Sequence, residues 1–346
     1  MMTVTLLNTF RRDDIREKLA GKSILVTGGT GSFGKQFVRT VLGLDCVKRL
    51  IVFSRDEQKH FDMQQEFPDH KYPAIRYFLG DVRDLERLQM AFRGVDIVVH
   101  AAAQKHVSLA EYNPTECLRT NVWGAENVVR AAIDNGVGTV MALSTDKAVS
   151  PVNLYGASKL AAEKVFIAAN NLSGSAQTRF GAVRYGNVVG SRGSVVPFFR
   201  DLIRKNAEFL PITDERMTRF WITLQQGVDF VLSSMCLMKG GEIFIPKIPS
   251  MKMTDLAKTM APDLPYKVVG IRPGEKLHEV MVNEEEARTT REMDDRYVIH
   301  PMLSFWTTDA QTEGVPVPDD FRYASNTNSW WLSEHELLGM ISRLEL

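Results

Sequence analysis

Short apolar runs alternate with helix-length segments along the first half of the chain, and this alternation limits its fold more than any other feature. Runs rich in β-branched residues recur at 24–27, 50–53, 75–79, 97–99, 139–143 and 180–184. The run Ile97-Val98-Val99 has no alternating polar residues, which is typical of a strand covered on both faces. We therefore predict an α/β fold with a doubly wound parallel sheet, whose ligands lie at the carboxyl ends of the strands.

Beyond Asn187 the alternation weakens, because glycine and proline interrupt shorter elements. A chain of 346 residues is also long for one compact core. We predict a helical extension at 1–20 and a nucleotide-binding domain at 21–186. The remainder, 187–346, is expected to form mainly a smaller α/β lobe for the substrate, some segments of which could rejoin the first domain.

Charge and cysteine content argue against several classes of partner and site. Lys and Arg total 42 and Asp and Glu total 42, so no overall field attracts nucleic acid or an anionic membrane. The cysteines Cys46, Cys117 and Cys236 lie far apart without metal-ligand spacing, which argues against disulfides and a metal site. Residues 1–20 contain no apolar run long enough for a signal peptide or a membrane span. We therefore expect a cytoplasmic protein without membrane insertion, metal or nucleic-acid partner.

A glycine-rich loop, Gly28-Gly-Thr-Gly31-Ser-Phe-Gly34, connects the first apolar run to a predicted helix at 35–42. Gly28 permits a tight turn, Gly31 lets the backbone approach a pyrophosphate, and Gly34 lets helix and strand pack closely. The helix start adds N–H donors and the positive end of its dipole. This order of strand, glycines and helix favours a dinucleotide site on a Rossmann-like fold over a simple turn. The loop residues expected at the cofactor are Gly28, Thr30, Gly31, Ser32, Phe33 and Gly34.

The end of the second run indicates which dinucleotide binds. NAD sites usually have an acidic residue there, which accepts the ribose 2′-hydroxyl and would repel a 2′-phosphate. This chain instead has Ser54 and Arg55, with Lys59 four residues later, and these side chains could bind a dianionic phosphate by charge-assisted hydrogen bonds. We therefore predict NADP rather than NAD, the alternative being that Arg55 faces solvent beside Asp56.

Residues after the third and fourth runs are expected to complete the cofactor site. Asp81, followed by Val82, could accept a hydrogen bond from the adenine amino group, or it could cap a helix that starts near Leu85. Ala101 and Ala102 offer small side chains against which a cofactor can lie, although a close-packed helix start would need the same residues.

Tyr155 and Lys159 are the strongest candidates for catalysis. Residues four apart share one face of a helix, so the Lys159 ammonium can lie near the Tyr155 phenol and the cofactor ribose. A nearby cation would lower the phenol pKa from about 10 toward a range useful for removing an alcohol proton. This spacing also arises by chance between surface residues, but its place after the fifth strand of a glycine-loop fold favours catalysis. Just before it, the fifth run leads into Thr145-Asp146-Lys147.

In their order, these motifs resemble those of extended short-chain dehydrogenases/reductases, and specifically the inverting UDP-N-acetylglucosamine 4,6-dehydratases of bacterial surface-sugar synthesis. The resemblance extends from about residue 22 to residue 279. The matching stretches are 27–34, 100–107, 144–151, 153–159, 184–188, 219–223 and 272–279. Ordinary epimerases and reductases of the superfamily generally lack the Asp146-Lys147 pair.

The resemblance implies a dehydration that begins with hydride transfer from C4 of the sugar to NADP⁺. Lys147 is then implied as the base that removes the C5 proton, and Asp146 as the acid that protonates the departing C6 hydroxyl, with Thr145 bound to the sugar. Hydride returns to C6, and Tyr155 is a candidate donor of the proton that inverts C5. These roles need a neutral Lys147 and a protonated Asp146, which burial against substrate and mutual coupling could produce.

The resemblance also implies a UDP-sugar as the substrate. Arginine forks suit diphosphate oxygens, and Lys105 would lie between cofactor and sugar. The residues expected in these roles are Lys105, Asn187, Arg192, Arg219, Arg272 and Glu275. Each charged one alone could be a structural ion pair or a solvated charge, and Asn187 could hold a turn. Two other functions share most of these motifs, a nucleotide-sugar C4 epimerase or reductase and a non-catalytic NADP-binding regulator.

A homo-oligomer is expected, from a dimer up to a hexamer. In many relatives the helices that correspond to 115–135 and 154–169 form a four-helix dimer interface, and here they carry more apolar residues than one sheet face readily covers. The alternative is that the whole apolar stripe packs on its own sheet. The extension at 1–20 is a candidate for contacts between dimers.

Overall fold

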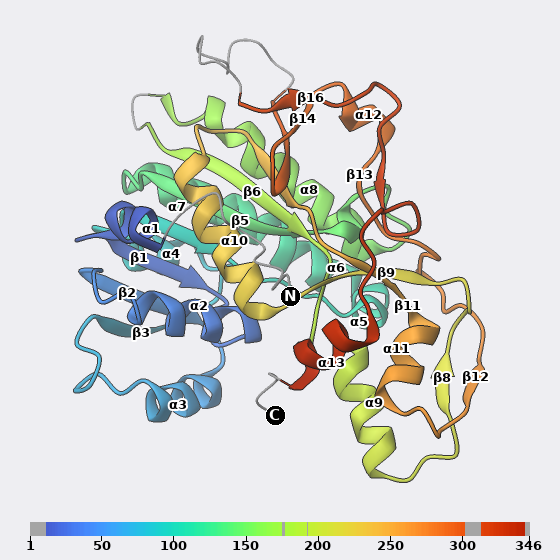
Figure 1. Ribbon diagram of the computed structural model, residues 1–346. Coiled ribbons are helices and arrows are strands. Elements are labelled where there is room, and N and C mark those ends of the chain that lie inside the picture. The colour runs from blue at the N-terminus through green and yellow to red at the C-terminus, as the bar shows by residue number, and fades with distance from the viewer. Residues whose placement is uncertain (1–11, 175–176, 192, 302–312, 343–346) are drawn as a thin grey trace.

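The computed structural model describes residues 12–174, 177–191, 193–301 and 313–342 of the protein. A large sheet forms its centre (Figure 1), and its parallel strands are β1 (Ser23–Thr27), β2 (Arg49–Ser54), β3 (Ile75–Leu79), β4 (Ile97–His100), β5 (Thr139–Thr145), β6 (Arg179–Tyr185) and β10 (Ile243–Pro246). They lie in the order β10-β6-β5-β4-β1-β2-β3. Because β1 lies inside the sheet and later strands extend it on both sides, the predicted doubly wound α/β fold is confirmed.

Burial explains why the apolar runs form these strands. Every residue of β1 and of β4 is buried, which requires cover on both faces of the sheet. Each predicted run is a strand, and its ends differ from the prediction by at most two residues. The runs were therefore well placed by their apolar, β-branched and aromatic residues.

Helices cover the two faces of the sheet (Figure 1). One face carries α1 (Arg12–Leu19), α2 (Ser32–Leu42) and α10 (Leu224–Leu237). The other face carries α4 (Leu85–Ala91), α7 (Gly124–Asp134) and α8 (Leu154–Ala168). The connecting helices are α3 (Glu57–Glu66), α5 (Val107–Tyr112), α6 (Pro114–Leu118) and a π-helix at Arg119–Trp123. α1 belongs to the predicted N-terminal extension, whose first part, 1–11, lies outside the described residues.

A second lobe is built from the later part of the chain. Its strands β7 (Asn187–Val188), β9 (Thr218–Ile222) and β11 (Ser250–Lys252) form one small sheet, and β8 (Leu210–Ile212) pairs in parallel with β12 (Tyr266–Val268). Its helices are α9 (Val195–Arg204), α11 (Met253–Met260) and α13 (Glu334–Ser342). Phe199, Trp221 and Leu337 belong to an apolar core of its own, so this lobe folds around separate side chains from those that cover the large sheet.

Other late segments return to the large sheet. Beyond β10 it continues with antiparallel pairing through β15 (Arg296–Ile299), β14 (Thr290–Glu292) and β16 (Val315–Pro316). β13 (Val280–Val282) pairs with β17 (Tyr323–Ala324), and the short α12 (Glu284–Ala287) follows β13. β13 also contacts the turn that follows β5. Late segments are thereby brought to the carboxyl ends of the parallel strands.

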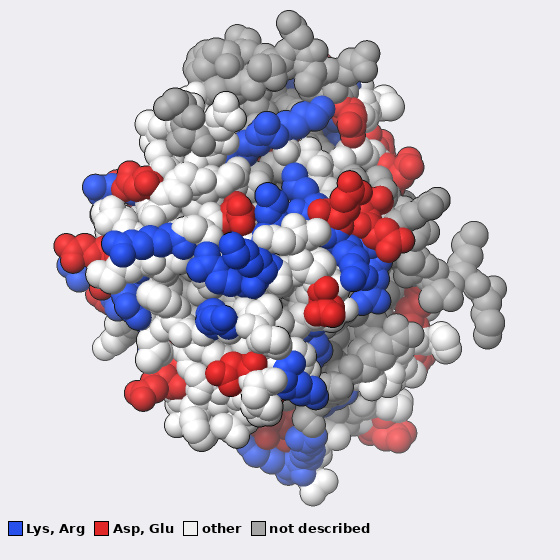
Figure 2. Space-filling model, turned by 90° about the vertical axis from the view of Figure 1, so that its left-hand side faces the viewer, with Lys and Arg blue, Asp and Glu red and all other residues white. Residues whose placement is uncertain are grey.

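Charged side chains of both signs are mixed on the face drawn in Figure 2, which is the left-hand side of Figure 1. Lys and Arg gather in a band across its middle, with Asp and Glu among and around them. Over the whole sequence the two kinds of charge balance, 42 against 42. Within the described ranges, every helix is too short or too polar to cross a membrane.

Candidate active site

A long cleft runs along the carboxyl ends of the parallel strands, from the glycine loop to the second lobe. Its lining includes the loop after β1, the ends of β2 and β5, the start of α8, and parts of α9 and β8. This edge is where ligands bind in doubly wound folds. The residues predicted for the site line this cleft, with two exceptions. Asp146 is fully buried, and Arg192 lies outside the described residues.

Two glycines of the loop after β1 occupy positions where a side chain does not fit. Gly28 has φ +66°, and a Cβ there would lie 2.8 Å from the backbone nitrogen of Ala102. A Cβ on Gly34 would lie 2.4 Å from Cα of Gly29, closer than Cβ atoms come to other atoms in real proteins. These close approaches let the amino end of α2 face the cleft, which is the geometry that a pyrophosphate site requires.

The end of β2 brings a hydroxyl and basic groups to the cleft. Ser54 Oγ lies 2.8 Å from Thr30 Oγ1, which ties β2 to the glycine loop. Arg55 is exposed, with Nη1 3.7 Å from an Asp81 oxygen, and Lys59 Nζ lies 2.6 Å from an Asp56 oxygen. Exposed ion pairs of this kind contribute little to stability, because water screens them. An incoming phosphate can therefore compete for both cations.

Asp81 does not cap α4, so one of its two predicted roles is wrong. The cap is Asp84, whose side chain accepts a hydrogen bond from the backbone N–H of Arg87, because Asp84 directly precedes the first helical turn. Asp81 instead accepts hydrogen bonds from the backbone and the guanidinium of Arg83. Burial alone would raise the pKa of Asp81, but Arg83 and Arg55 lower it below its usual range.

Thr145, Asp146 and Lys147 form the polar end of β5. Thr145 ends the strand, and a short 3-10 helix, Asp146–Ala148, follows. Lys147 Nζ donates to Asp146 Oδ1 at 3.0 Å, and Thr145 Oγ1 donates to the same oxygen at 2.9 Å. The second oxygen of Asp146 is buried without a hydrogen-bond partner among the described residues. Protonation of this carboxylate would remove a buried charge, so Asp146 is suited to donate a proton.

The electrostatics of this pair match one of the two expected protonation states. Burial is the largest effect on Asp146 and raises its pKa, as the role of an acid requires. Burial alone would lower the pKa of Lys147, but Asp146 and Glu279 outweigh burial and raise it above its usual range. In the free protein the two carboxylates favour the ammonium form of Lys147, whereas the expectation of a neutral Lys147 concerns the site with substrate bound. A proton has to move within the pair before Lys147 can act as a base.

α8 presents Tyr155 and Lys159 to the cleft. The side chain of Asn153 caps this helix, and Lys159 Nζ donates to the carbonyl of Leu143 at 2.7 Å, which holds the ammonium against β5. Burial lowers the pKa of Lys159 to about 8 and raises the pKa of Tyr155 to about 12. The expected lowering of the Tyr155 pKa is thus wrong for the free protein. Burial outweighs the nearby cation, and that cation is Lys147 rather than Lys159.

The second lobe brings Asn187 and Arg219 to the catalytic end of the cleft. Asn187, in β7, accepts a hydrogen bond from Lys147 Nζ at 3.3 Å, a contact that was not predicted. Arg219, in β9, is buried and donates to nearby backbone carbonyls. Much of its hydrogen-bonding capacity is therefore used inside the protein.

The remaining predicted residues lie along the cleft. Arg272 is exposed, and its Nη1 lies 3.8 Å from Oε1 of Glu275, so these two residues form an ion pair. Lys105 lines the same cleft, and burial lowers its pKa. Arg272 is accessible to a diphosphate, whereas Arg219 is mainly engaged by protein groups.

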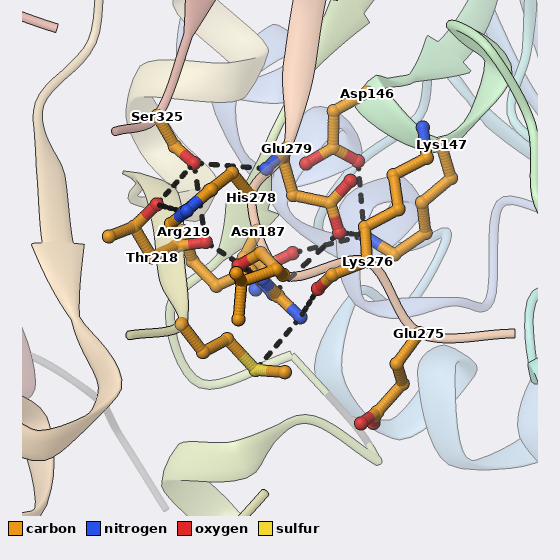
Figure 3. A network of polar contacts seen from close by, with 12 residues as sticks. Asp146, Lys147, Asn187, Thr218, Arg219, Glu275, Lys276, His278, Glu279 and Ser325 are labelled. Atoms are coloured by element: carbon orange, nitrogen blue, oxygen red, sulfur yellow. Dashed lines mark hydrogen bonds and ion pairs between the residues drawn. The ribbon is translucent and has the colours of Figure 1, made fainter. Parts of the chain in front are cut away.

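Glu279 is a residue of this cluster that was not predicted from the sequence (Figure 3). Its Oε1 lies 3.5 Å from Lys147 Nζ and 3.6 Å from Arg219 Nε. Burial alone would raise the pKa of Glu279, but Lys147, Arg219 and Lys276 lower it. Its position at the end of the matching stretch 272–279 was a signal, but the sequence did not indicate which residues it would contact.

Comparison with known proteins agrees with the family resemblance of the sequence motifs. A family model described as polysaccharide biosynthesis protein matches residues 24–301. The chain is 56% identical over 331 residues to the UDP-N-acetylglucosamine 4,6-dehydratase (inverting) of Campylobacter jejuni, covering 94% of this chain and 98% of that protein. It is 41% identical over 285 residues to a UDP-glucose 4-epimerase of Rickettsia bellii, and this match covers 80% of this chain and 82% of that protein.

Among solved structures, Pen from Bacillus thuringiensis is similar, with a TM-score of 0.85, 37% identity, and coverage of 94% of this chain and 98% of that chain. The resemblance inferred from the motifs is thus confirmed. The match to the family model covers most of the sequence and both lobes. The chain belongs to the polysaccharide biosynthesis protein family.

Proposed function

We propose that this protein is an NADP-dependent UDP-N-acetylglucosamine 4,6-dehydratase that inverts C5. The observation that carries the proposal is the 3.0 Å contact between Lys147 and Asp146, beside the cleft that Tyr155 and Lys159 line. An epimerase needs the tyrosine and Lys159, but it does not need a separate acid and base to remove water. The inverting dehydratase of Campylobacter jejuni, 56% identical, bears the name of this reaction.

The cofactor end of the cleft fits NADP. Gly28 and Gly34 let the glycine loop pack closely against the backbone of Ala102 and Gly29, so that the amino end of α2 can face a pyrophosphate. Ser54, Arg55 and Lys59 offer one hydroxyl and two positive charges to a 2′-phosphate. The other residues proposed to contact the cofactor are Thr30, Gly31, Ser32, Phe33, Asp81, Val82, Ala101, Ala102, Lys105, Tyr155 and Lys159. When bound, the cofactor supplies the acceptor and later the donor of hydride.

In the first step Tyr155 accepts the proton of the C4 hydroxyl as hydride leaves C4. Burial raises the pKa of Tyr155 to about 12, so positive charge must stabilise its phenolate during the reaction. The Lys147 ammonium lowers this pKa, Lys159 is held one helical turn away, and a bound cofactor in its oxidised form would supply further positive charge. We assign Lys159 the role of binding the cofactor ribose and supporting the phenolate.

Elimination follows, because a C4 ketone acidifies the proton on C5. A proton passes from Lys147 to Asp146 along their 3.0 Å contact, which leaves a neutral amine and a carboxylic acid. Burial of Asp146 favours this transfer, since it raises the pKa of the carboxyl group. Lys147 then removes the C5 proton, and Asp146 protonates the C6 hydroxyl, which leaves as water. Thr145 binds the sugar, and Tyr155 returns a proton to C5 from the opposite face, which inverts that centre.

The substrate end of the cleft is proposed to bind a UDP-sugar. Arg272 is exposed beside Glu275, and a guanidinium can bind two diphosphate oxygens at once. The other residues proposed to contact the substrate are Lys105, Asn187, Arg192 and Arg219.

Mass spectrometry after incubation with UDP-N-acetylglucosamine and NADP tests the proposed function. A dehydratase releases a product that is lighter by one water. A C4 epimerase releases a different sugar of unchanged mass, and a non-catalytic regulator returns the substrate unaltered. Loss of water together with inversion at C5, read by NMR, is the expected result, and an unchanged mass would overturn the proposal.

A further inference from the structure

The Lys147 ammonium lies between two buried carboxylates. Its Nζ is 3.0 Å from Asp146 Oδ1 and 3.5 Å from Glu279 Oε1, and these acidic residues are 0% and 2% exposed. The same oxygen, Glu279 Oε1, lies 3.6 Å from Arg219 Nε. The proposed acid and base thus contact a second ion pair, formed by Glu279 and Arg219, and the proposed mechanism gives Glu279 no role.

Residues from distant parts of the chain hold Glu279 in this place (Figure 3). Its backbone N–H donates to Ser325 Oγ at 2.9 Å, and its carbonyl accepts from the Ser325 N–H at 2.8 Å. Ser325 Oγ lies 2.7 Å from Thr218 Oγ1, which in turn lies 2.8 Å from His278 Nδ1. The loop before β13, the start of β9 and the residue after β17 therefore fix one carboxylate beside Lys147.

The burial of Glu279 is not explained by stability. Its Oε2 is buried without a hydrogen-bond partner among the described residues. A buried carboxylate with an unpaired oxygen destabilises the folded state, and a buried ion pair is often no more stabilising than apolar residues of similar size. Charged groups kept in such surroundings next to a proton-transfer pair are candidates for a functional role.

We propose that Glu279 is a positioning residue for the elimination step: its carboxylate holds Lys147 Nζ beside Asp146 and stabilises the ammonium that forms when Lys147 takes the C5 proton. This inference rests on the proposed function and on the roles proposed there for Lys147 and Asp146. Glu279 itself gives up no proton, and Arg219 balances its charge.

The charges that change during elimination explain why Glu279 matters. The C5–H bond breaks and its proton binds Lys147 Nζ, while its electron pair forms the C5=C6 bond. The C6–O bond breaks, and the proton of Asp146 leaves with the hydroxyl as water. The pair thus changes from two neutral groups to an ammonium and a carboxylate. Glu279 contacts the end that becomes positive. The same attraction disfavours the neutral Lys147 that must form first, so Glu279 assists elimination chiefly by keeping Lys147 Nζ beside Asp146.

Removal of this negative charge should lower the pKa of Lys147. The sign follows because an anion stabilises the protonated form of a neighbouring amine. The other charged and titratable groups that face Lys147 or Glu279 are Asp146 after β5, Tyr155 of α8, Lys105 after β4, Arg219 of β9 and Lys276 before β13. They are unchanged in a Glu279 variant, so a shift in the pH profile reports the loss of the Glu279 charge.

Glu279→Gln keeps the shape of the side chain and removes its charge. Single-turnover elimination, measured as solvent deuterium entering C5, should slow by roughly 10- to 100-fold, the range typical of groups that orient a reacting residue. C4 oxidation, followed by the absorbance of the reduced nicotinamide, should continue near the wild-type rate. In the plot of elimination rate against pH, the alkaline limb should move to lower pH by about one pH unit or more. Equal slowing of both steps with an unmoved limb would mean a structural role and overturn the proposal.

Two further variants make the test specific. Glu242→Gln removes a buried charge just before β10, at the amino ends of the parallel strands and so opposite the cleft. It should leave the rates of C4 oxidation and elimination, and the alkaline limb of the pH profile, unchanged. Glu279→Asp restores the charge on a side chain that is shorter by one methylene. The alkaline limb of the pH profile should therefore return to its wild-type position, although elimination stays slow. If Glu279→Gln does not fold, selective slowing of elimination in Glu279→Asp is the required result, and equal slowing of both steps overturns the proposal. Wild-type protein that releases no water would instead disprove the proposed function.

Discussion

Lys147 is the residue at which the proposed proton transfers meet, since it contacts Asp146, Asn187 and Glu279. Lys147→Ala should still bind NADP and oxidise C4, but dehydration should fall by about 10²-fold or more, because a positioned proton-transfer group is lost. Deuterium exchange at C5 in heavy water, measured by NMR, should fall with it. Lys164→Ala, which truncates an exposed lysine of α8, is the matched control. Wild-type turnover in Lys147→Ala would remove this residue from the mechanism.

Arg55 is the residue that should discriminate between the two dinucleotides. Arg55→Asp places a carboxylate where the 2′-phosphate is proposed to bind, so the ratio of the NADP and NAD dissociation constants should shift toward NAD. Titration calorimetry on cofactor-stripped protein measures both constants. Arg93→Asp changes another exposed arginine in the turn before β4, at the opposite edge of the sheet, and should not alter the ratio. An unaltered ratio in Arg55→Asp would indicate that this arginine only faces solvent.

Residue identities could be predicted at this scale, but their protonation states could be predicted only in part. Tyr155 and Lys159 were found because helical spacing is a local property of the sequence. The pKa of Tyr155 was predicted in the wrong direction, because burial, which depends on the whole fold, raises it. Glu279 was missed for a similar reason, since its contacts with Lys147 and Arg219 exist only after distant segments have packed together.

At the scale of elements, the strands and the glycine loop could be predicted because their signals are local. β-branched content marks β1 to β6, and the glycine spacing marks the turn into α2. The pairing of β13 with β17, and the antiparallel addition of β14, β15 and β16 to the large sheet, were not predicted. These strands are short, and their partners lie far away in sequence, so no periodic pattern indicates the pairing.

The packing of α2 on the glycine loop can be tested with one methyl group. Gly34→Ala would place a Cβ 2.4 Å from Cα of Gly29, and overpacking against backbone typically destabilises by about 1–3 kcal/mol. Urea unfolding should show this loss, together with weaker cofactor binding. Gly227→Ala, in α10, adds a methyl group that meets no described atom within 4 Å apart from its chain neighbours and its own helix backbone, and it should be neutral or stabilise by up to about 1 kcal/mol. Equal effects of both changes would contradict the close approach at Gly34.

The whole molecule is proposed to be a homo-oligomer, a dimer or larger, that functions in the cytoplasm. Val128 and Phe166 pack in the chain's own core, so part of the predicted apolar stripe covers its own sheet. Trp123, next to α7, is 51% exposed, and Leu160 and Val165 of α8 remain partly exposed. An apolar surface on neighbouring helices is typical of a subunit contact.

Light scattering at micromolar concentration should therefore give at least a dimeric mass. Trp123→Glu should lower that mass, because it places a charge in the proposed contact, whereas Lys164→Glu, on an exposed position of α8, should change it less. A truncated chain that lacks residues 1–20 should remain at least a dimer but lose any larger assembly. A monomeric mass with full activity would contradict this prediction.

The hydrogen bonds between Glu279 and Ser325 span 46 residues of sequence, and they have a consequence for the newly made chain. During translation, at about 5–20 residues per second, the glycine loop and the strands up to β6 leave the ribosome well before Ser325 does. The dinucleotide half can then fold while the carboxylate beside Lys147 still lacks its anchor. A nascent chain would thus gain the ability to hold its cofactor before it can remove water from a sugar.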